Sequence, residues 1–378
     1  MRNHVEKLLH HQLDILTLKA VGEIDLVLRQ TNDLLRTWAD KAALEKQMAT
    51  LDETANKWLQ PYPNAGWREN VEVLLVALTV ALGVRTFFLQ PFKIPTGSMQ
   101  PTLYGVTSSA DSTVKIPAAW ERFKEWFHGV SYVHRVAETD GELQGVGEPI
   151  RFFIFNIKQT LFQGGRAYTI WFPPDYGSSS LKQRAGIHDR QFFHKGDDIV
   201  NLRISAGDHL FVDRMTYNFR PPTRGEIIVF QTKGIDSLPQ DQFYIKRLVA
   251  LSGEQVQIGD DRHLIIDGKR LDAATPHFGS VYGFNPGDPP RESHYSGQVN
   301  QKVLENFLPP GAVFMPLFPN QSAAYEVAKD HLMVMGDNTM NSLDSRYWGD
   351  FPSSNVIGRA FFVYWPVTER FGWGCLDH

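Results

Sequence analysis

The stretch Phe243-Tyr-Ile-Lys-Arg-Leu-Val-Ala-Leu251 decides the fold of this chain. It is a short apolar run rich in β-branched and aromatic residues, which is typical of a β-strand. Because side chains alternate between the two faces of a strand, Lys246 shares a face with Tyr244, Leu248 and Ala250. The sequence therefore predicts a strand that holds a lysine among apolar neighbours.

Similar runs, separated by Gly, Pro and Asp, occur on both sides of this strand from about residue 200 onward. The predicted strands are His209–Asp213, Glu226–Phe230, Gln255–Ile258, His263–Ile266, Leu332–Met335 and Ala360–Trp365. Asp267-Gly268 predicts a tight turn after the fourth of them. Strands and helices do not alternate here, which disfavours a parallel α/β fold. We expect a mainly β fold with a partly closed antiparallel sheet.

Two blocks within this region, residues 104–205 and 272–330, are less regular and rich in aromatic residues, Pro and Gly. They predict insertions or a subsidiary β lobe.

The most apolar stretch of the chain is Val71–Leu89, which is long enough for a membrane-spanning helix. Glu72 and Arg85 lie near its ends, where long side chains reach water. The alternative is a buried core helix, since the uncharged part, Val73–Val84, has only twelve residues. Trp67 favours the membrane span, because tryptophan is enriched at membrane interfaces. The segment begins too far along the chain for a cleavable signal peptide, so we expect a retained anchor.

The first sixty residues predict helix. Apolar residues recur there near helical spacing, at Leu9, Leu13, Leu16, Ile24, Leu28, Leu35, Trp38 and Ala42. An amphipathic hairpin, a coiled coil and a membrane-surface helix all fit this pattern.

Composition narrows the function further. The chain has 378 residues, and 38 Lys and Arg against 42 Asp and Glu give a net charge of −4, which argues against a general nucleic-acid binder. The single cysteine, Cys375, excludes an intramolecular disulfide and a Cys-rich zinc site. We expect no metal and no cofactor.

A candidate nucleophile follows the apolar segment directly, in Ile94-Pro-Thr-Gly-Ser-Met-Gln-Pro-Thr-Leu103. Pro95 and Pro101 stiffen the loop, and Gly97 permits a backbone conformation that exposes Ser98. A serine in such a segment is more often a turn former than a nucleophile. Its place, where the chain leaves the bilayer, favours the catalytic interpretation.

A serine nucleophile needs a base, and the chain contains no G-x-S-x-G, H-E-x-x-H or P-loop motif. Lys246 is the candidate, because burial between apolar neighbours lowers the pKa of a lysine and favours its neutral amine. The alternative is a lysine that extends to solvent from an edge strand.

The third element is Gly336-Asp-Asn-Thr-Met-Asn-Ser-Leu-Asp-Ser-Arg-Tyr-Trp-Gly349, a polar segment after an apolar strand. Asp344 and Arg346 could pair, and Ser342 could orient an amine. An ordinary Asx-rich turn is the alternative.

Together these elements resemble the bacterial type I signal peptidases, membrane-bound Ser/Lys endopeptidases that remove signal peptides from exported preproteins. Five motifs carry the resemblance in the order found in that family: I-P-T-G-S-M-Q-P-T-L, then G-D-H-L-F-V-D-R-M-T-Y from Gly207, R-G-E-I-I-V-F from Arg224, Y-I-K-R-L-V-A-L-S-G-E from Tyr244 and the segment from Gly336. It covers residues 70–105, 206–270 and 330–366.

The resemblance implies roles for individual residues. Ser98 would be the nucleophile and Lys246 its general base, and the backbone N–H of Ser98 with the hydroxyl of Thr96 would hold the oxyanion. Ser342 would hydrogen-bond the lysine amine. The supporting residues would be Asp337, Asp344 and Arg346. The pockets for small side chains at −1 and −3 would be lined by Phe92, Ile94, Val229, Tyr244 and Ile245. The substrate would bind extended, along strand edges.

The resemblance also implies a domain organisation. Residues 1–68 would be a cytoplasmic helical region, residues 69–90 the single transmembrane helix, and residues 91–378 an extracytoplasmic peptidase domain. The enzyme would sit in the bacterial plasma (inner) membrane. Its partners would be preproteins and the lipid bilayer, with the secretion machinery nearby and no nucleic acid.

Two features depart from the family pattern. Many members have Arg-Asp after Gly-Asp-Asn, where this chain has the uncharged pair Thr339-Met340. The Ser and Lys motifs are also much further apart than usual, mainly because of residues 104–205.

Two other functions fit part of the pattern. Self-cleaving repressors use a Ser/Lys dyad, but the apolar segment and the acidic balance argue against a DNA-bound regulator. An inactive membrane-tethered peptide-binding protein would not need both Ser98 and Lys246.

Overall fold

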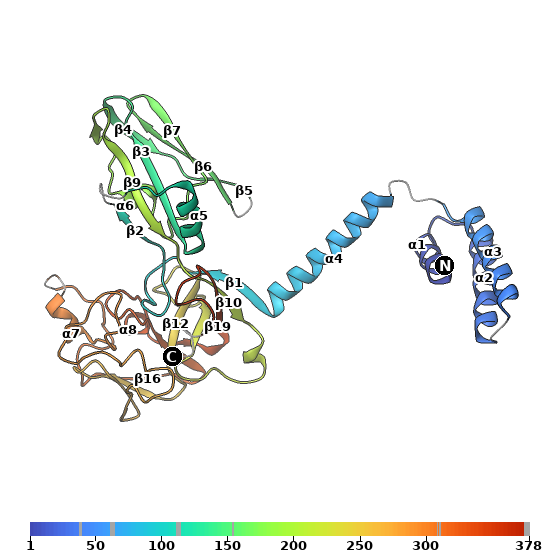
Figure 1. Cartoon of the computed structure of the whole chain (residues 1–378). Coiled ribbons are helices and arrows are strands. Elements are labelled where there is room, and N and C mark those ends of the chain that lie inside the picture. Colours follow the sequence, from blue (N-terminus) through green and yellow to red (C-terminus); the bar gives the residue numbers. More distant parts are fainter. Residues whose placement is uncertain are drawn as a thin grey trace. The chain divides into compact units, whose positions relative to one another are not determined.

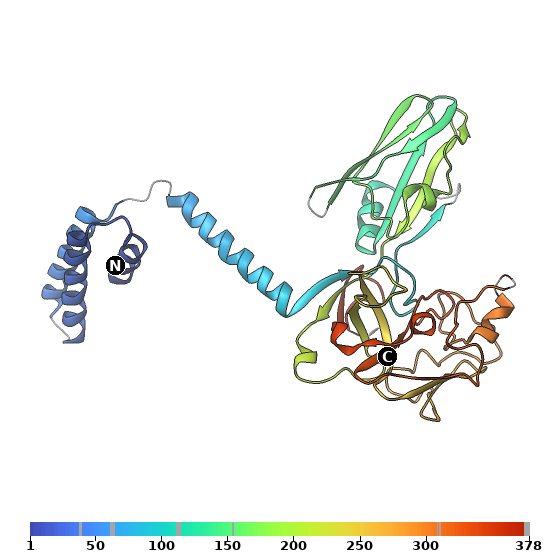
Figure 2. The ribbon, with the colours of Figure 1, turned by 180° about the vertical axis from the view of Figure 1, so that it is seen from behind.

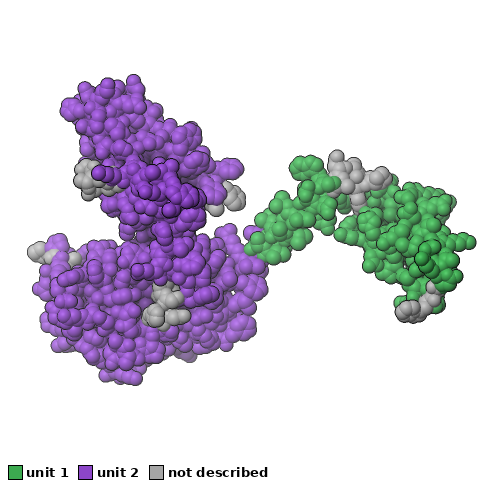
Figure 3. Space-filling model, in the orientation of Figure 1, with its two compact units in different colours: residues 1–81 green, residues 82–378 purple. Residues whose placement is uncertain are grey.

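The computed structural model describes residues 1–37, 40–60, 65–110, 115–152, 155–307, 309 and 311–373. Trp38 and Cys375 lie outside these described residues. The chain divides into two compact units, Met1–Ala81 and Leu82–His378 (Figure 3). The boundary between the units falls inside one helix, α4 (Ala65–Phe87).

The N-terminal unit contains α1 (Arg2–His11), α2 (Leu18–Arg36) and α3 (Lys41–Trp58), followed by the first part of α4. The side chains of Thr17 and Asp40 accept hydrogen bonds from backbone N–H groups at the starts of α2 and α3, which is why these helices begin there. The buried apolar residues of the unit are Val5, Leu9, Ile24, Val27, Leu28, Leu51 and Ala55. The predicted helical region is therefore confirmed, although Leu13 and Leu35 of the periodic set are exposed.

α4 is the single helix in the described part of the chain that is long and apolar enough to cross a membrane, over Gly66–Phe87. None of its apolar window is buried in the structure. This exposure disfavours the core-helix alternative, because a core helix packs against its neighbours. The helix ends at Phe87, and strand β1 begins at Leu89.

A seven-stranded antiparallel sheet forms the centre of the second unit (Figure 1). Its strands, in spatial order, are β1 (Leu89–Lys93), β10 (His209–Asp213), β19 (Val356–Trp365), β11 (Ile227–Gln231), β12 (Phe243–Ala250), β17 (His331–Met335) and β18 (Phe351–Pro352). Irregular register in β10, β11 and β12 lets the sheet curl. The mainly β fold predicted from the apolar runs is confirmed, and each predicted strand of this sheet is present within a few residues of its predicted bounds.

The described residues between 107 and 205 form a β lobe (Figure 2). The lobe has its own core, which includes Leu143, Leu161, Ile199 and Leu202. One sheet contains β2 (Thr107–Ala110), β9 (Asp198–Ser205) and β3 (Val130–Val136). The other contains β5 (Ile150–Phe152), β6 (Phe155–Gln163), β7 (Arg166–Trp171), β4 (Gly141–Val146) and β8 (Phe192–Phe193). Two short helices, α5 (Ala119–Phe127) and α6 (Leu181–Ala185), complete the lobe. Of the two alternatives for this block, the structure has the subsidiary β lobe.

A four-stranded sheet contains β15 (Lys269–Arg270), β14 (Leu264–Ile266), β13 (Gln255–Ile258) and β16 (Ala324–Glu326), the last of which comes from the second predicted insertion. Asp267 and Gly268 have φ of 49° and 75° and form the predicted turn between β14 and β15. The described residues between 272 and 330 are mostly irregular apart from β16 and the short helix α7 (Gln301–Leu304). Phe278 and Phe318 of this segment are buried in a core cluster. Helix α8 (Ser345–Trp348) follows β17. The remaining 3₁₀ turns are Thr216–Asn218, Glu305–Phe307 and Ser353–Asn355.

Candidate active site

The loop that carries Ser98 leaves the end of β1 and is held by apolar side chains on both sides of the serine. Ile94, Met99 and Leu103 are buried in the core beneath the sheet, whereas Ser98 is half-buried. Gly97 does not adopt the left-handed conformation that would call for glycine. A Cβ at this position would instead meet the side chain of Gln100 at 2.8 Å, so the glycine provides room rather than conformational freedom.

β12 brings Lys246 to this serine from 148 residues further along the chain. The Lys246 side chain is only 4% exposed, and its Nζ donates hydrogen bonds to Ser98 Oγ at 2.7 Å and to the carbonyl of Ile245 at 3.0 Å. The ring of Tyr244 lies 5.5 Å from the same nitrogen. Of the two interpretations of Lys246, the structure has the buried lysine and not one that extends to solvent.

Burial lowers the pKa of Lys246 from its ordinary value to about 8. The carboxylates of Asp344 and Asp337 act in the opposite direction, and the guanidinium of Arg346 adds to the lowering. Neither carboxylate forms an ion pair with Lys246. At pH 7 about one lysine in ten then carries the neutral amine that a base requires, and this share becomes half near pH 8.

The segment after β17 packs directly on the serine loop. The backbone N–H of Asn338 donates to the carbonyl of Ser98 at 3.1 Å, and its side-chain Nδ2 donates to the carbonyl of Gly97 at 2.9 Å. A Cβ on Gly336 would come within 2.4 Å of the Ser98 carbonyl oxygen, so glycine is required for this approach. Asn338 was not predicted as a site residue, although it stands in the Gly-Asp-Asn motif.

Asp344 and Arg346 form a fully buried, two-pronged ion pair behind the lysine, with both bonds at 2.8 Å. Asp344 also accepts a hydrogen bond from the backbone N–H of Gly336 at 2.9 Å. Arg346 Nη1 donates to Thr339 Oγ1 at 2.7 Å. Thr339, which belongs to the Thr339-Met340 departure from the family pattern, thus joins this network through its hydroxyl rather than through a charge.

Asp337 pairs with Arg247 in a second fully buried ion pair, with bonds of 2.7 and 2.8 Å. The Thr102 hydroxyl also donates to Asp337. Arg247 was missed by the sequence reasoning. Its position next to Lys246, on the opposite face of a strand, was the available signal.

The proposed contact of Ser342 with the lysine amine is not present. The hydroxyl of Ser342 is buried against Gly336, and the hydrogen bonds of Lys246 go to Ser98 and Ile245 within the described residues.

A groove of about 340 Å³ runs past Ser98 and Lys246. It is lined by the residues predicted for the substrate pockets and the oxyanion, Phe92, Ile94, Thr96, Val229, Tyr244 and Ile245. Gln242, Phe243, Asn341 and Leu343 line it as well and were not predicted. The ring of Phe243 packs edge-on against Phe92 at 5.4 Å between centroids. The Thr96 hydroxyl is exposed and has no hydrogen-bond partner among the described residues.

Comparison with known proteins places this site within a matched region. A family model described as signal peptidase, peptidase S26, matches residues 67–115 and 201–365. A probable signal peptidase I-2 of Synechocystis sp. is 31% identical over 172 residues, which are 44% of this chain and 59% of the relative. The signal peptidase I of Leptolyngbya laminosa is 31% identical, over 44% of this chain and 64% of the relative. A probable signal peptidase I-1 of Synechocystis sp. is 32% identical, over 46% and 68%.

The chain thus spans about 60% of the length of the first two relatives. Among solved structures, a signal peptidase I from Enterococcus faecalis aligns with a TM-score of 0.22 and 22% identity, over 37% of this chain and 97% of the other. Lobe residues 116–200 lie outside the family match.

Proposed function

The chain belongs to the signal peptidase family, peptidase S26, and from this premise we propose that it is a membrane-anchored endopeptidase that removes N-terminal signal peptides from exported preproteins. The observation that carries the proposal is the 2.7 Å contact between Lys246 Nζ and Ser98 Oγ in the groove. A serine hydroxyl within hydrogen-bond reach of a buried amine is the arrangement that nucleophilic catalysis needs.

In the proposed reaction, the neutral amine of Lys246 takes the proton of Ser98 as Oγ attacks the carbonyl carbon of the scissile bond. The oxyanion that forms accepts hydrogen bonds from the Ser98 N–H and from the Thr96 hydroxyl. The Thr96 hydroxyl is available for this because it has no hydrogen-bond partner among the described residues. The Lys246 ammonium then protonates the leaving amine, and the C–N bond breaks. Lys246 next deprotonates a water molecule, which hydrolyses the acyl-enzyme and releases the signal peptide.

The proposed specificity is for small side chains at −1 and −3. Val229 and Ile94 are almost fully buried, so the groove beside Ser98 has a closed apolar floor. Phe92 and Phe243, whose rings pack edge-on, add aromatic walls to the groove. Larger side chains would meet these walls, and the substrate would lie extended beside β1 and β12.

The proposed topology places residues 1–68 in the cytoplasm, α4 across the bacterial plasma membrane and residues 91–378 outside, near the secretion machinery. The length and apolar exposure of α4 support the span. The orientation follows from the proposed substrate, whose cleavage site emerges on the extracytoplasmic side.

The test is cleavage of a preprotein with alanine at −1 and −3 by the full chain in lipid vesicles. Ser98→Ala and Lys246→Ala should each lower kcat by about 10⁴-fold or more while the chain still folds and inserts. Lys246→Arg should fail as well, because a guanidinium cannot act as base. Thr96→Val should cost about 10²–10³ in kcat, and Thr96→Ser should retain most of it.

Matched controls are Ser178→Ala and Lys269→Ala, at exposed positions away from the groove, which should leave the rate unchanged. A Lys246→Ala variant that cleaves at the wild-type rate would end the dyad proposal. Equal cleavage of a preprotein with leucine at −1 would end the proposed specificity while leaving the dyad intact.

A further inference from the structure

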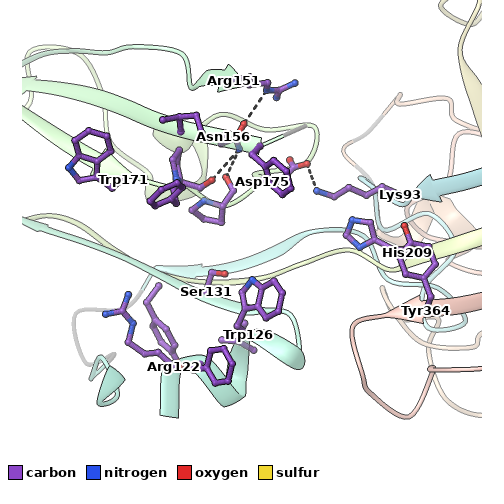
Figure 4. A pocket seen from close by; sticks show the side chains of 18 of the residues that line it. Lys93, Arg122, Trp126, Ser131, Arg151, Asn156, Trp171, Asp175, His209 and Tyr364 are labelled. Carbon is purple, nitrogen blue, oxygen red and sulfur yellow. Dashed lines mark hydrogen bonds and ion pairs between the residues drawn. The ribbon is translucent and has the colours of Figure 1, made fainter. Parts of the chain in front are cut away.

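A second, larger groove of about 1190 Å³ lies between the β lobe and the central sheet (Figure 4). Lys93, His209 and Tyr364 of the sheet line one end, and α5 with β5–β7 of the lobe forms the two long walls. Most of the lobe residues that line it fall in the part of the chain that the family match leaves out. The role of this groove therefore does not follow from the family.

The two walls of the groove present large aromatic side chains to solvent. Phe123 and Trp126 on α5 are 52% and 53% exposed, and Phe155, Trp171 and Phe172 on the opposite wall are 62–71% exposed. No residue of α5 is buried. Exposed apolar side chains gathered on one surface mark a binding site on a soluble domain or a contact with lipid.

Each wall also carries a guanidinium group. Arg122 comes from α5 and forms no ion pair within the described residues, while Arg151 comes from β5 and is hydrogen-bonded to Asn156 (Figure 4). Lys93 is neutralised by its ion pair with Asp175. The charged groups that remain among the lining residues are the two guanidinium groups, so the groove carries a net positive charge. Guanidinium groups bind phosphate through paired hydrogen bonds.

The lobe is fastened to the sheet at the end of this groove. The backbone N–H of Val367 donates to the carbonyl of Phe127 at 2.9 Å, and the His128 ring lies 2.6 Å from the Val367 carbonyl. The groove is also close to α4 along the chain, because Lys93 comes six residues after the end of that helix at Phe87. Six residues span at most about 20 Å, so the Lys93 end lies within reach of the headgroups if α4 crosses the membrane.

From these observations we infer that the groove binds anionic phospholipids of the membrane that anchors the protein. The acyl chains lie between the aromatic walls, and lipid phosphates pair with Arg122 on one wall and with Arg151 on the other. Aromatic side chains combined with basic ones are typical of surfaces that rest in the membrane interface. An apolar signal-peptide segment would use the aromatic walls but would leave the guanidinium groups without a partner. The inference rests on the proposed span of α4.

The test uses the full chain with Cys375→Ser and one new cysteine that carries an environment-sensitive fluorophore. The chain is placed in vesicles of phosphatidylcholine and phosphatidylglycerol with brominated acyl chains, which quench by contact. Labels at Phe123→Cys and Phe155→Cys report on the groove. The matched control is Phe192→Cys, which is 53% exposed in the same lobe but does not line the groove. Val80→Cys in α4 reports on the span itself.

Quenching at positions 123 and 155 should be roughly threefold stronger than at 192. In the double variant Arg122→Gln and Arg151→Gln, half-maximal quenching at positions 123 and 155 should need roughly tenfold more phosphatidylglycerol than in the wild type. If position 80 is quenched but 123 and 155 behave like 192, the groove does not bind lipid. Quenching at 123 and 155 only on addition of a brominated signal peptide would assign the groove to the substrate and overturn the inference.

Equal quenching in pure phosphatidylcholine, unaffected by the arginine substitutions, would overturn the phosphate contact. An unquenched label at position 80 would overturn the span. Preprotein cleavage, measured on the same vesicles, reports on the proposed peptidase function independently of all these outcomes.

Discussion

Lys246 and Arg247 are neighbours in β12, yet their side chains meet opposite electrostatic environments. Arg247 is paired with Asp337, and this carboxylate raises the pKa of the guanidinium. Lys246 has carboxylates nearby but no ion pair, so burial dominates and lowers its pKa to about 8. One side chain is thus held as a structural cation, and the other can give up its proton.

The lowered pKa of Lys246 predicts the pH dependence of cleavage. Below about pH 8 the amine is mostly protonated and cannot act as base, so kcat/KM should fall roughly tenfold per pH unit on acidification. Above pH 8 the rate should level off. The measurement is kcat/KM from pH 6 to 10 on a peptide substrate without titrating groups. The control is Lys269→Ala, whose pH profile should match that of the wild type. A rate that keeps rising to pH 10 would show an unshifted lysine and contradict the burial argument.

At the scale of elements, the site depends on how β12 is joined to the segment after β17. The Arg247–Asp337 pair connects them inside the protein, where an unpaired charge is costly. Arg247→Met should therefore lower the free energy of unfolding by about 3–5 kcal/mol, and adding Asp337→Leu should recover much of the loss.

The control for the buried Arg247–Asp337 pair is the exposed ion pair of Arg270 and Asp261. Arg270→Met should cost less than about 1 kcal/mol, because solvent screens that pair. Both variants are measured by denaturant unfolding of the full chain in the same detergent. Equal costs for the two would mean that the buried pair does not join the two elements.

Local sequence predicted most strands of the central sheet, but it predicted neither the individual lobe strands nor the strand partners. Runs such as Phe243–Ala250 identify strands because β-branched and aromatic residues favour an extended, half-buried backbone. The order of strands in the sheet depends on contacts between distant segments, which local pattern does not contain. The same limit hid the Arg247–Asp337 pair and the contacts of Asn338. Ser98 and Lys246 were predicted from motifs, whereas their 2.7 Å contact could be seen only in the fold.

At the scale of the whole molecule, the chain consists of two units with separate cores, divided within α4. The proposed topology predicts that the membrane separates them. A protease added outside intact spheroplasts should degrade residues 91–378 and leave a protected fragment that contains α1–α3. An epitope at the exposed position Leu18 should stain only after the membrane is permeabilised. Staining of intact cells at that position would reverse the orientation.

The buried amine of Lys246 also has a thermodynamic consequence for the folded chain. The unfolded chain binds a proton at this lysine up to about pH 10.5, whereas the folded chain releases it near pH 8. Below pH 8 this difference of about 2–3 pKa units destabilises the fold by about 3 kcal/mol, and the penalty disappears as pH rises toward 10.5. Lys246→Met should therefore be inactive yet more stable than the wild type at pH 7, with a gain that shrinks in unfolding experiments at pH 10. If Lys246 is the base, as proposed, it is retained at the expense of conformational stability, which is the trade-off expected when selection acts on turnover rather than on stability.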